Sequence, residues 1–232
     1  MNHRQKSKPN QWEDHYTRKA RKENKPARSV YKLEEIQAKF HLIRKGDKVL
    51  DLGCAPGSWL LFAAEQAGSG GQVVGIDRTP LSIPVPPHVR VWTGDILAPD
   101  EELTAVFAGV FDVVLSDMAP ATTGNRIVDA TRSLELCQAA LDIAGACLRP
   151  GGSFVCKIFQ GEDFKSFADT VRRCFDSHKI FKPQSCRKAS KEIYIIGKGK
   201  QQEALCQDTA NGRASSTKKP LSMPNAEKSS PS

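Results

Sequence analysis

The chain has 232 residues, of which 39% are hydrophobic, and a formal net charge of +8 at pH 7. This length suits one ordinary domain with its own core, so we do not expect a second full domain. No apolar run approaches the roughly 18 residues that a membrane span requires, which excludes an integral membrane protein. The seven cysteines form no CxxC pair, and the five histidines lack metal-ligand spacing. We therefore expect reduced thiols, no metal site and a cytoplasmic protein.

The positive charge is concentrated at the N-terminus. Residues 1–48 hold 14 Lys and Arg against 6 Asp and Glu, whereas residues 49–232 hold 20 of each. Within the first 27 residues, cations alternate with aromatic residues such as Trp12 and Tyr16. Cations and stacking faces together suit a nucleic acid, so residues 1–27 are expected to form a basic binding arm. A basic tail that only keeps the protein soluble is the alternative.

The apolar periodicity predicts alternating helices and strands. Val30, Leu33, Ile36 and Phe40 have helical spacing, with Ser29 as the candidate N-cap. Further strands are expected at residues 48–53, 72–77, 89–92, 111–117, 153–159, 178–182 and 192–197, and further helices at residues 58–67, 130–148 and 163–175. This alternation predicts an α/β fold with a doubly wound, mostly parallel seven-stranded sheet and a late antiparallel edge strand.

Charged residues follow the predicted strands at the edge where such sheets bind ligands. They are Asp51, Asp77, Asp95, Asp117 and Lys157. Taken singly, each aspartate is better explained as a helix cap or turn residue, but four together favour a binding site.

The turn after the first strand distinguishes between ligands. Its sequence, DLGCAPGSW at residues 51–59, lacks both the GxGxxG and the GxxxxGK[ST] patterns. A phosphate ligand and a NAD-dependent oxidoreductase are therefore disfavoured. A carboxylate repels phosphate but suits a ligand that bears an ammonium and a sulfonium, as S-adenosylmethionine does. Asp77 is then placed to bind a ribose diol, and Asp95 to bind an adenine amino group.

Five motifs in order show a resemblance to a known family. They are RSVYKL at residues 28–33, DLGCAPGSW at 51–59, SDMAP at 116–120, GGSFVCKIFQG at 151–161 and SKEIY at 190–194. Over residues 28–199 the chain resembles the FtsJ-type ribose 2′-O-methyltransferases, most closely the bacterial members that modify large-subunit ribosomal RNA. The resemblance implies a Rossmann-like, S-adenosylmethionine-dependent methyltransferase domain over residues 28–200. Ser58 departs from the family, which has a second glycine there, and residues 201–232 form an extension that we expect to be disordered.

The resemblance also implies roles for individual residues. It implies a catalytic tetrad of Lys32, Asp117, Lys157 and Glu192, and cofactor contacts at Gly57, Trp59, Asp77, Asp95 and Asp117. Methyl transfer requires the enzyme to hold the attacking 2′-oxygen and steer its proton, without a metal. We expect Lys157 to act on that proton, Asp117 to position Lys157, and Lys32 and Glu192 to orient the ribose. Keeping an ordinary lysine neutral near pH 7.5 costs about 4 kcal/mol, and the sequence leaves open how this is achieved.

The substrate is expected to be a ribose, with uridine as the implied nucleoside, in 23S ribosomal RNA of the large subunit or its precursor. Residues 182–200 hold six Lys and Arg against one Glu, so this segment and the N-terminal arm are expected to bind RNA phosphates on either side of the site. Two alternatives stay open: another RNA substrate, such as transfer RNA or a messenger-RNA cap, and a non-catalytic ribosome-assembly factor that binds RNA. A monomer is expected.

Overall fold

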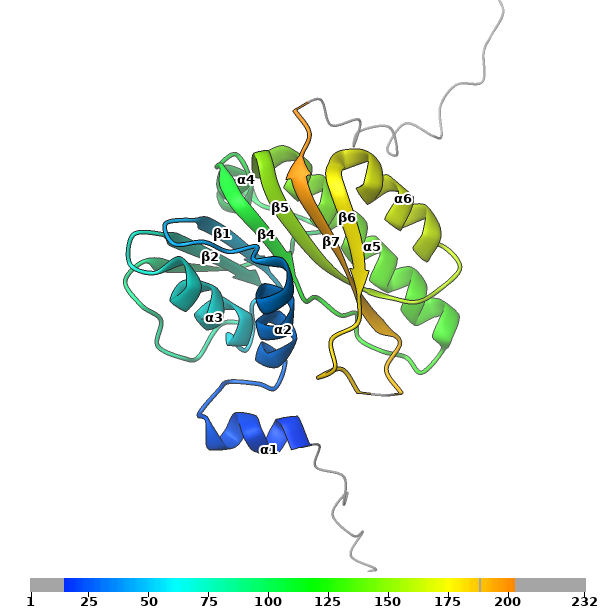
Figure 1. Ribbon diagram of the computed structural model, residues 1–232, viewed down its shortest axis with the longest axis horizontal. Coiled ribbons are helices and arrows are strands. Elements are labelled where there is room, and N and C mark those ends of the chain that lie inside the picture. The colour runs from blue at the N-terminus through cyan, green and yellow to red at the C-terminus, as the bar shows by residue number, and fades with distance from the viewer. Residues whose placement is uncertain (1–14, 188, 203–232) are drawn as a thin grey trace, which may run out of the picture.

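The computed structural model describes residues 15–187 and 189–202, which form one α/β unit (Figure 1). The strands are β1 (Lys48–Leu52), β2 (Gln72–Asp77), β3 (Val89–Thr93), β4 (Phe111–Ser116), β5 (Leu148–Phe159), β6 (Phe175–Phe181) and β7 (Glu192–Lys200). The helices are α1 (His15–Lys22), α2 (Val30–Phe40), α3 (Ser58–Ala67), α4 (Glu101–Phe107), α5 (Arg126–Cys147) and α6 (Phe164–Cys174).

All seven strands belong to one sheet with the order β3-β2-β1-β4-β5-β7-β6. Strands β1 to β5 run parallel, and β7 lies antiparallel between β5 and β6. This confirms the doubly wound α/β fold with late antiparallel pairing at one edge of the sheet. The strand order reverses between β1 and β4, and such a reversal opens a crevice for ligands beyond the carboxyl ends of the strands.

The two faces of the sheet carry separate hydrophobic layers. Side chains of α2 and α3 pack on one face, and side chains of α5 and α6 pack on the other. In Figure 1, α2 and α3 accordingly lie on one side of the strands while α5 and α6 lie on the other. Leu33 and Ile36 are fully buried, as the helical spacing of α2 predicts.

The termini of several helices differ from the prediction for local reasons. Ser29 occupies the N-cap position of α2, as predicted, but its side chain makes no capping hydrogen bond. Helix α5 begins four residues earlier than predicted, where the Asn125 side chain accepts hydrogen bonds from the N–H groups of Ile127 and Val128. The short helix α4 was not predicted, although Asp100 caps it through the N–H of Leu103.

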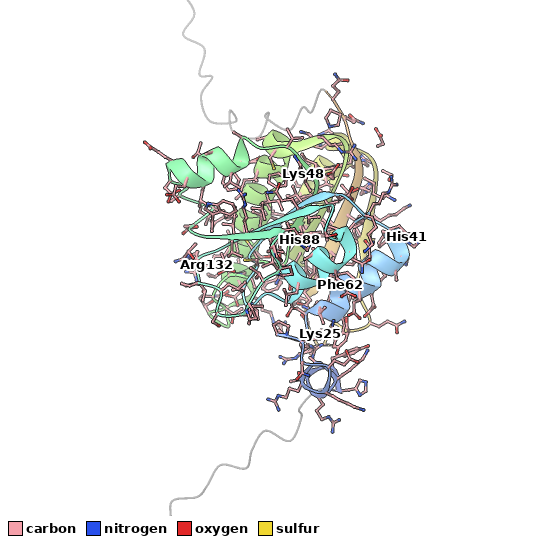
Figure 2. All side chains as sticks on the ribbon, turned by 90° about the vertical axis from the view of Figure 1, so that its left-hand side faces the viewer. Lys25, His41, Lys48, Phe62, His88 and Arg132 are labelled. Carbon is pink, nitrogen blue, oxygen red and sulfur yellow. The ribbon has the colours of Figure 1, made fainter. Side chains whose placement is uncertain are left out.

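The second half of the predicted arm forms helix α1, which joins α2 through aromatic and polar contacts. The Tyr31 hydroxyl donates to Glu23 at 2.8 Å, and the Tyr16 and Tyr31 rings lie 5.5 Å apart. In Figure 2, α1 lies below the domain, with Lys25 near the junction between them. Residues 1–14, and residues 203–232 of the predicted tail, lie outside the described residues.

Five cysteines are free and buried, namely Cys54, Cys137, Cys147, Cys156 and Cys186. Cys174 is disulfide-bonded, so the expectation of reduced thiols is wrong for this residue. Within the described ranges, no helix is both long and apolar enough to cross a membrane, and no group of His, Cys, Asp and Glu is arranged to hold a metal ion.

Candidate active site

A pocket of about 540 Å³ lies at the carboxyl edge of β1, β2, β3 and β4. Three residues singled out from the sequence line it, namely Asp77, Asp95 and Asp117. Sequence reasoning missed other lining residues, which include Met118, Arg132 and Leu136. The last two lie on α5, far from any turn motif in the chain, so no local sequence signal marks them.

Asp77 and Asp95 are held by backbone groups close to them. Asp77 accepts hydrogen bonds from the N–H groups of Ala55, at 2.9 Å, and Thr79, at 2.7 Å. Asp95 accepts from the N–H of Leu97 at 3.0 Å. A carboxylate has about four acceptor positions, so both side chains keep capacity for a ligand in the pocket.

Asp51 lies behind these residues in β1 and is fully buried. Neither of its carboxylate oxygens has a hydrogen-bond partner among the described residues. Burial, followed by the negative charges of Asp117 and Asp77, raises the pKa of this carboxyl well above its usual value. The raised pKa favours the protonated carboxyl when no cation lies nearby, and a cationic ligand would favour its ionised form, so the site suits a ligand with cationic groups.

Gly57 and Trp59, predicted as cofactor contacts, do not line the pocket. Gly57 has φ +106° at the start of α3, and a Cβ there would lie 2.3 Å from Cδ1 of Ile83, so only glycine fits. The Trp59 side chain is 3% exposed, and its Nε1 donates to the backbone oxygen of Ser29 at 2.8 Å. Ser58, the departure from the family, donates to Ala27 O at 3.2 Å. These two side chains fasten α3 to the segment that leads into α2.

A buried polar cluster lies beside the pocket, and one of its ion pairs joins Lys157 to Asp117. Lys157 is 6% exposed, and its Nζ lies 3.1 Å from Oδ1 of Asp117. The same Nζ donates to the backbone oxygen of Asp117. The hydroxyl of Tyr194, a fully buried residue of β7, donates to Oδ1 of Asp117 at 2.7 Å. Asp117 therefore belongs both to the pocket and to the cluster.

The second ion pair joins Lys32 of α2 to Glu192 of β7. The Lys32 Nζ lies 2.9 Å from Oε1 and 3.0 Å from Oε2 of Glu192. Lys32 Nζ also lies 5.9 Å from the centre of the Tyr194 ring, which thus contacts both ion pairs. Because β7 runs antiparallel to β5, its first residue reaches the same edge as the ends of the parallel strands. The structure thus brings the four residues of the implied tetrad together.

Comparison with known families agrees with this geometry. Residues 26–200 match the model of the FtsJ-like methyltransferases. The chain belongs to the FtsJ-like methyltransferase family. Members of this family use S-adenosylmethionine as the methyl donor, which supplies an electrophilic methyl group on a sulfonium.

Curated relatives of this FtsJ-like chain are similar over most of their length. A protein of Desulforapulum autotrophicum named ribosomal RNA large subunit methyltransferase E is 59% identical over 197 residues, which cover 85% of this chain and 97% of the relative. A protein of the same name from Desulfosudis oleivorans is 54% identical over 189 residues, which cover 82% of this chain and 91% of the relative.

Solved structures share the fold. A ribosomal RNA methyltransferase from Plasmodium falciparum aligns with a TM-score of 0.65 and 27% identity, over 75% of this chain and 98% of that one. Human methyltransferase-like protein 13, in complex with SAH, aligns with a TM-score of 0.52 and 13% identity, over 71% and 77% of the two chains. The second likeness concerns the fold alone.

Proposed function

We propose that this protein transfers the methyl group of S-adenosylmethionine to a ribose 2′-hydroxyl in large-subunit ribosomal RNA. The observation that carries the proposal is the pair of buried ion pairs, Lys157–Asp117 and Lys32–Glu192, next to a pocket lined by Asp77, Asp95 and Asp117. Such a cluster is costly to bury and is expected where proton positions matter. The names of the two curated relatives support ribosomal RNA as the substrate.

The residues of the pocket fit the cofactor. Asp77 has acceptor positions for the ribose diol, and Asp95 for the adenine amino group. The buried Asp51 carboxyl has no hydrogen-bond partner among the described residues, and it can ionise next to the cationic part of the ligand, so that Asp51 and Asp117 together attract this part. Gly57 and Trp59 contribute indirectly, since the loop and helix that they shape lie beside the pocket.

We infer that Lys157 accepts the proton of the 2′-hydroxyl as a neutral amine. A neutral amine has two N–H donors and one lone pair. The backbone and carboxylate oxygens of Asp117 accept two hydrogen bonds from Nζ, which leaves the lone pair for the 2′-hydroxyl proton. After transfer, the ammonium of Lys157 is stabilised by the Asp117 carboxylate. Lys32 and Glu192 orient the hydroxyl and its ribose, and Tyr194 keeps Asp117 in place.

We further propose that residues 1–27 form an RNA-binding arm, residues 28–200 the methyltransferase domain, and residues 201–232 a disordered tail. Within α1, the exposed side chains of Arg18 and Lys22 are one turn apart and so face the same way. Of residues 182–200, the cations before β7, such as Lys182 and Lys191, lie on the Glu192 side of the sheet and supply further phosphate contacts. Lys198 and Lys200 lie towards the opposite end of β7, where their amines donate to backbone oxygens, so they do not take part. RNA phosphates bound at both places hold the target ribose over Lys157.

Salt dependence tests the role of the arm. Changing Arg18 and Lys22 to Gln removes up to two phosphate contacts, which reduces the slope of log K against log salt by about one to two. A matched pair, Lys48→Gln with Arg90→Gln, removes the same charge at the amino ends of β1 and β3 and should leave the slope unchanged. Equal slopes for both pairs would contradict the role of the arm.

The finer parts of the function are also proposals. We infer a uridine of 23S ribosomal RNA as the target, and action in the cytoplasm as a monomer. The same site suits a ribose in transfer RNA, because the chemistry at the 2′-oxygen does not depend on the RNA class. A non-catalytic RNA-binding factor is the other candidate, but it has no need for a buried lysine paired next to a cofactor pocket.

The deciding experiment supplies radiolabelled S-adenosylmethionine and three RNA substrates from cells that lack the enzyme. These are free large-subunit RNA, assembled large subunits and transfer RNA, each followed by mapping of ribose methylation. We expect label in a 2′-O-methyl nucleotide of ribosomal RNA that disappears with Lys157→Ala. If label appeared only in transfer RNA, transfer RNA rather than ribosomal RNA would be the substrate. Binding of the cofactor without methyl transfer to any of the three RNAs would favour the non-catalytic factor.

A further inference from the structure

The segment between β6 and β7, residues 182–191, is fastened to α2 by a side chain outside the tetrad. Oε2 of Glu35 accepts a hydrogen bond from the N–H of Gln184 at 2.6 Å, and Oε1 accepts one from the N–H of Ser185 at 2.8 Å. Both oxygens of one carboxylate thus hold consecutive peptide groups of this turn. Bonds between a carboxylate and backbone N–H groups are among the stronger hydrogen bonds in proteins.

The opposite side of the same turn is also held. The Arg28 guanidinium, just before α2, donates to the backbone oxygen of Ser185, which is fully buried. The N–H of Ser185 is therefore bound by Glu35 in the middle of α2, and its C=O by Arg28 just before this helix. The turn cannot move relative to this helix without breaking charge-assisted hydrogen bonds.

Cys186, the residue that follows Gln184 and Ser185, lies next to Glu192. Cys186 is 7% exposed, and burial, followed by the charge of Glu192 and a side-chain hydrogen bond to it, raises the pKa of the thiol to about 12. The thiol therefore stays protonated at neutral pH, and it lies close enough to Glu192 to interact with the carboxylate that pairs with Lys32.

Glu35 and Lys32 are three positions apart on α2, so they lie on neighbouring turns of one helix surface. The contacts form a closed circuit from Glu35 to the turn, through Cys186 to Glu192, and back through Lys32 to the same helix. The Lys32–Glu192 distance is thus fixed from two sides.

We propose that Glu35 is a positioning residue that holds Glu192 against Lys32 by clamping the turn at Gln184 and Ser185 to α2. The inference rests on the proposed function, because it assigns Glu35 a role through two members of the tetrad. Glu35 does not touch the cofactor pocket, whose lining residues come from other elements. Its loss should therefore affect the rate of methyl transfer rather than the affinity for the cofactor.

The experiment compares full-length Glu35→Ala and Glu35→Gln with Glu34→Ala, a matched control that removes the neighbouring carboxylate of the same helix. We expect Glu35→Ala to lower kcat about tenfold or more at an unchanged KM for S-adenosylmethionine. Glu35→Gln should recover part of the rate, since its amide oxygen accepts one of the two hydrogen bonds. Glu34→Ala should stay within about twofold of the wild type, because the half-buried Glu34 lies beside the clamp but does not bind the amides of Gln184 and Ser185, which Glu35 holds.

Hydrogen exchange gives a readout that does not depend on activity. The amides of Gln184 and Ser185 should exchange faster in Glu35→Ala than in the wild type, while the amides of β1 and β4 keep their protection. If Glu35→Ala does not fold, Glu35→Gln carries both measurements with a smaller expected change. Unchanged exchange at both amides, or an equal loss of rate in Glu34→Ala, would overturn the proposal.

A double-substitution cycle separates this inference from the proposed function. If Glu35 acts through Glu192, adding Glu35→Ala to Glu192→Ala should lower kcat no further. If the fold-losses in kcat of the two single variants multiplied in the double variant, Glu35 would act independently of Glu192. That result would overturn the positioning role of Glu35 but leave the tetrad assignment unchanged. Wild-type activity of Glu192→Ala would instead overturn the tetrad itself, and the positioning role with it.

Discussion

The two halves of the carboxyl edge are built differently. On the pocket side, Asp77 and Asp95 are each fixed by an N–H group two residues further along the chain. On the side of β5 and β7, Lys32 pairs with Glu192 across 160 positions, and Tyr194 reaches Asp117 across 77. Locally anchored side chains can be altered one at a time, whereas buried ion pairs leave an uncompensated charge when one partner is removed. Binding and chemistry should therefore respond to substitution separately.

The largest expected effect tests the catalytic half. Lys157→Ala should lower kcat by about 10²- to 10⁴-fold, the usual contribution of a general base. The affinity for S-adenosylmethionine, measured by calorimetry, should change little, because Lys157 does not line the pocket. Lys157→Arg is the matched control: it keeps a cation for Asp117 but cannot accept a proton, so it should be nearly as inactive. A wild-type rate in either variant would end the assignment of Lys157 as the base.

The next effect tests the pocket half. Asp77→Ala should weaken cofactor binding about 10- to 100-fold, because hydrogen bonds to a charged group contribute about 1.5–3 kcal/mol each. At saturating cofactor, kcat should stay within a few-fold of the wild type. Asp163→Ala, at an exposed carboxylate that makes no capping bond, serves as the control. If Asp77→Ala lowered kcat as much as it lowered the affinity for the cofactor, cofactor binding and catalysis would not depend on separate halves of the edge.

A pH-dependent effect follows from Asp51, which lies between the halves. Its pKa is raised in the folded protein, so above the pKa of the unfolded chain the native state binds more protons. The contribution of Asp51 to stability therefore falls as pH rises from 5 to 8 in the absence of cofactor. Asp51→Asn does not titrate, so the wild type should lose stability relative to this variant over that range.

Urea unfolding of both proteins at several pH values measures this difference. Asp77 and Asp117 face Asp51 and are present in both proteins, so their own titration largely cancels in the comparison. Parallel stability curves for the wild type and Asp51→Asn would show that Asp51 is ionised throughout. S-adenosylmethionine should reduce the pH dependence, since its cationic groups favour the ionised carboxylate.

The same division decides what the sequence predicts. The sheet and most helices follow from apolar periodicity, because their residues interact with near neighbours in the chain. Asp77 and Asp95 could be placed in the pocket because a strand end fixes where its next side chain lies. The arm helix α1 was missed because its single buried residue, Ala20, leaves almost no apolar pattern.

Contacts between residues that are far apart in the sequence cannot be predicted from local sequence patterns. The four tetrad residues were found through the family resemblance, and spacing alone says nothing of which lysine meets which carboxylate. The clamp at Glu35 was not predicted at all, since it joins a helix carboxylate to backbone amides 149 and 150 positions away. Trp59 differs from both: its motif is present, its indole is turned towards Ser29 and Tyr194, and the cofactor contact that the resemblance implies stays a prediction.

The smallest expected effect concerns this tryptophan. Trp59→Phe keeps an aromatic ring near Tyr194 but removes the Nε1 donor to Ser29 O, which should cost about 1 kcal/mol of folding free energy. For a chain of this size, that corresponds to a fall in Tm of about 2–4 °C. Trp92→Phe, at a partly buried indole of β3, is the matched control. Because the Trp59 indole binds Ser29 and does not line the pocket, the affinity for the cofactor should not change. A clear loss of affinity would instead support the contact between Trp59 and the cofactor that the family resemblance implies.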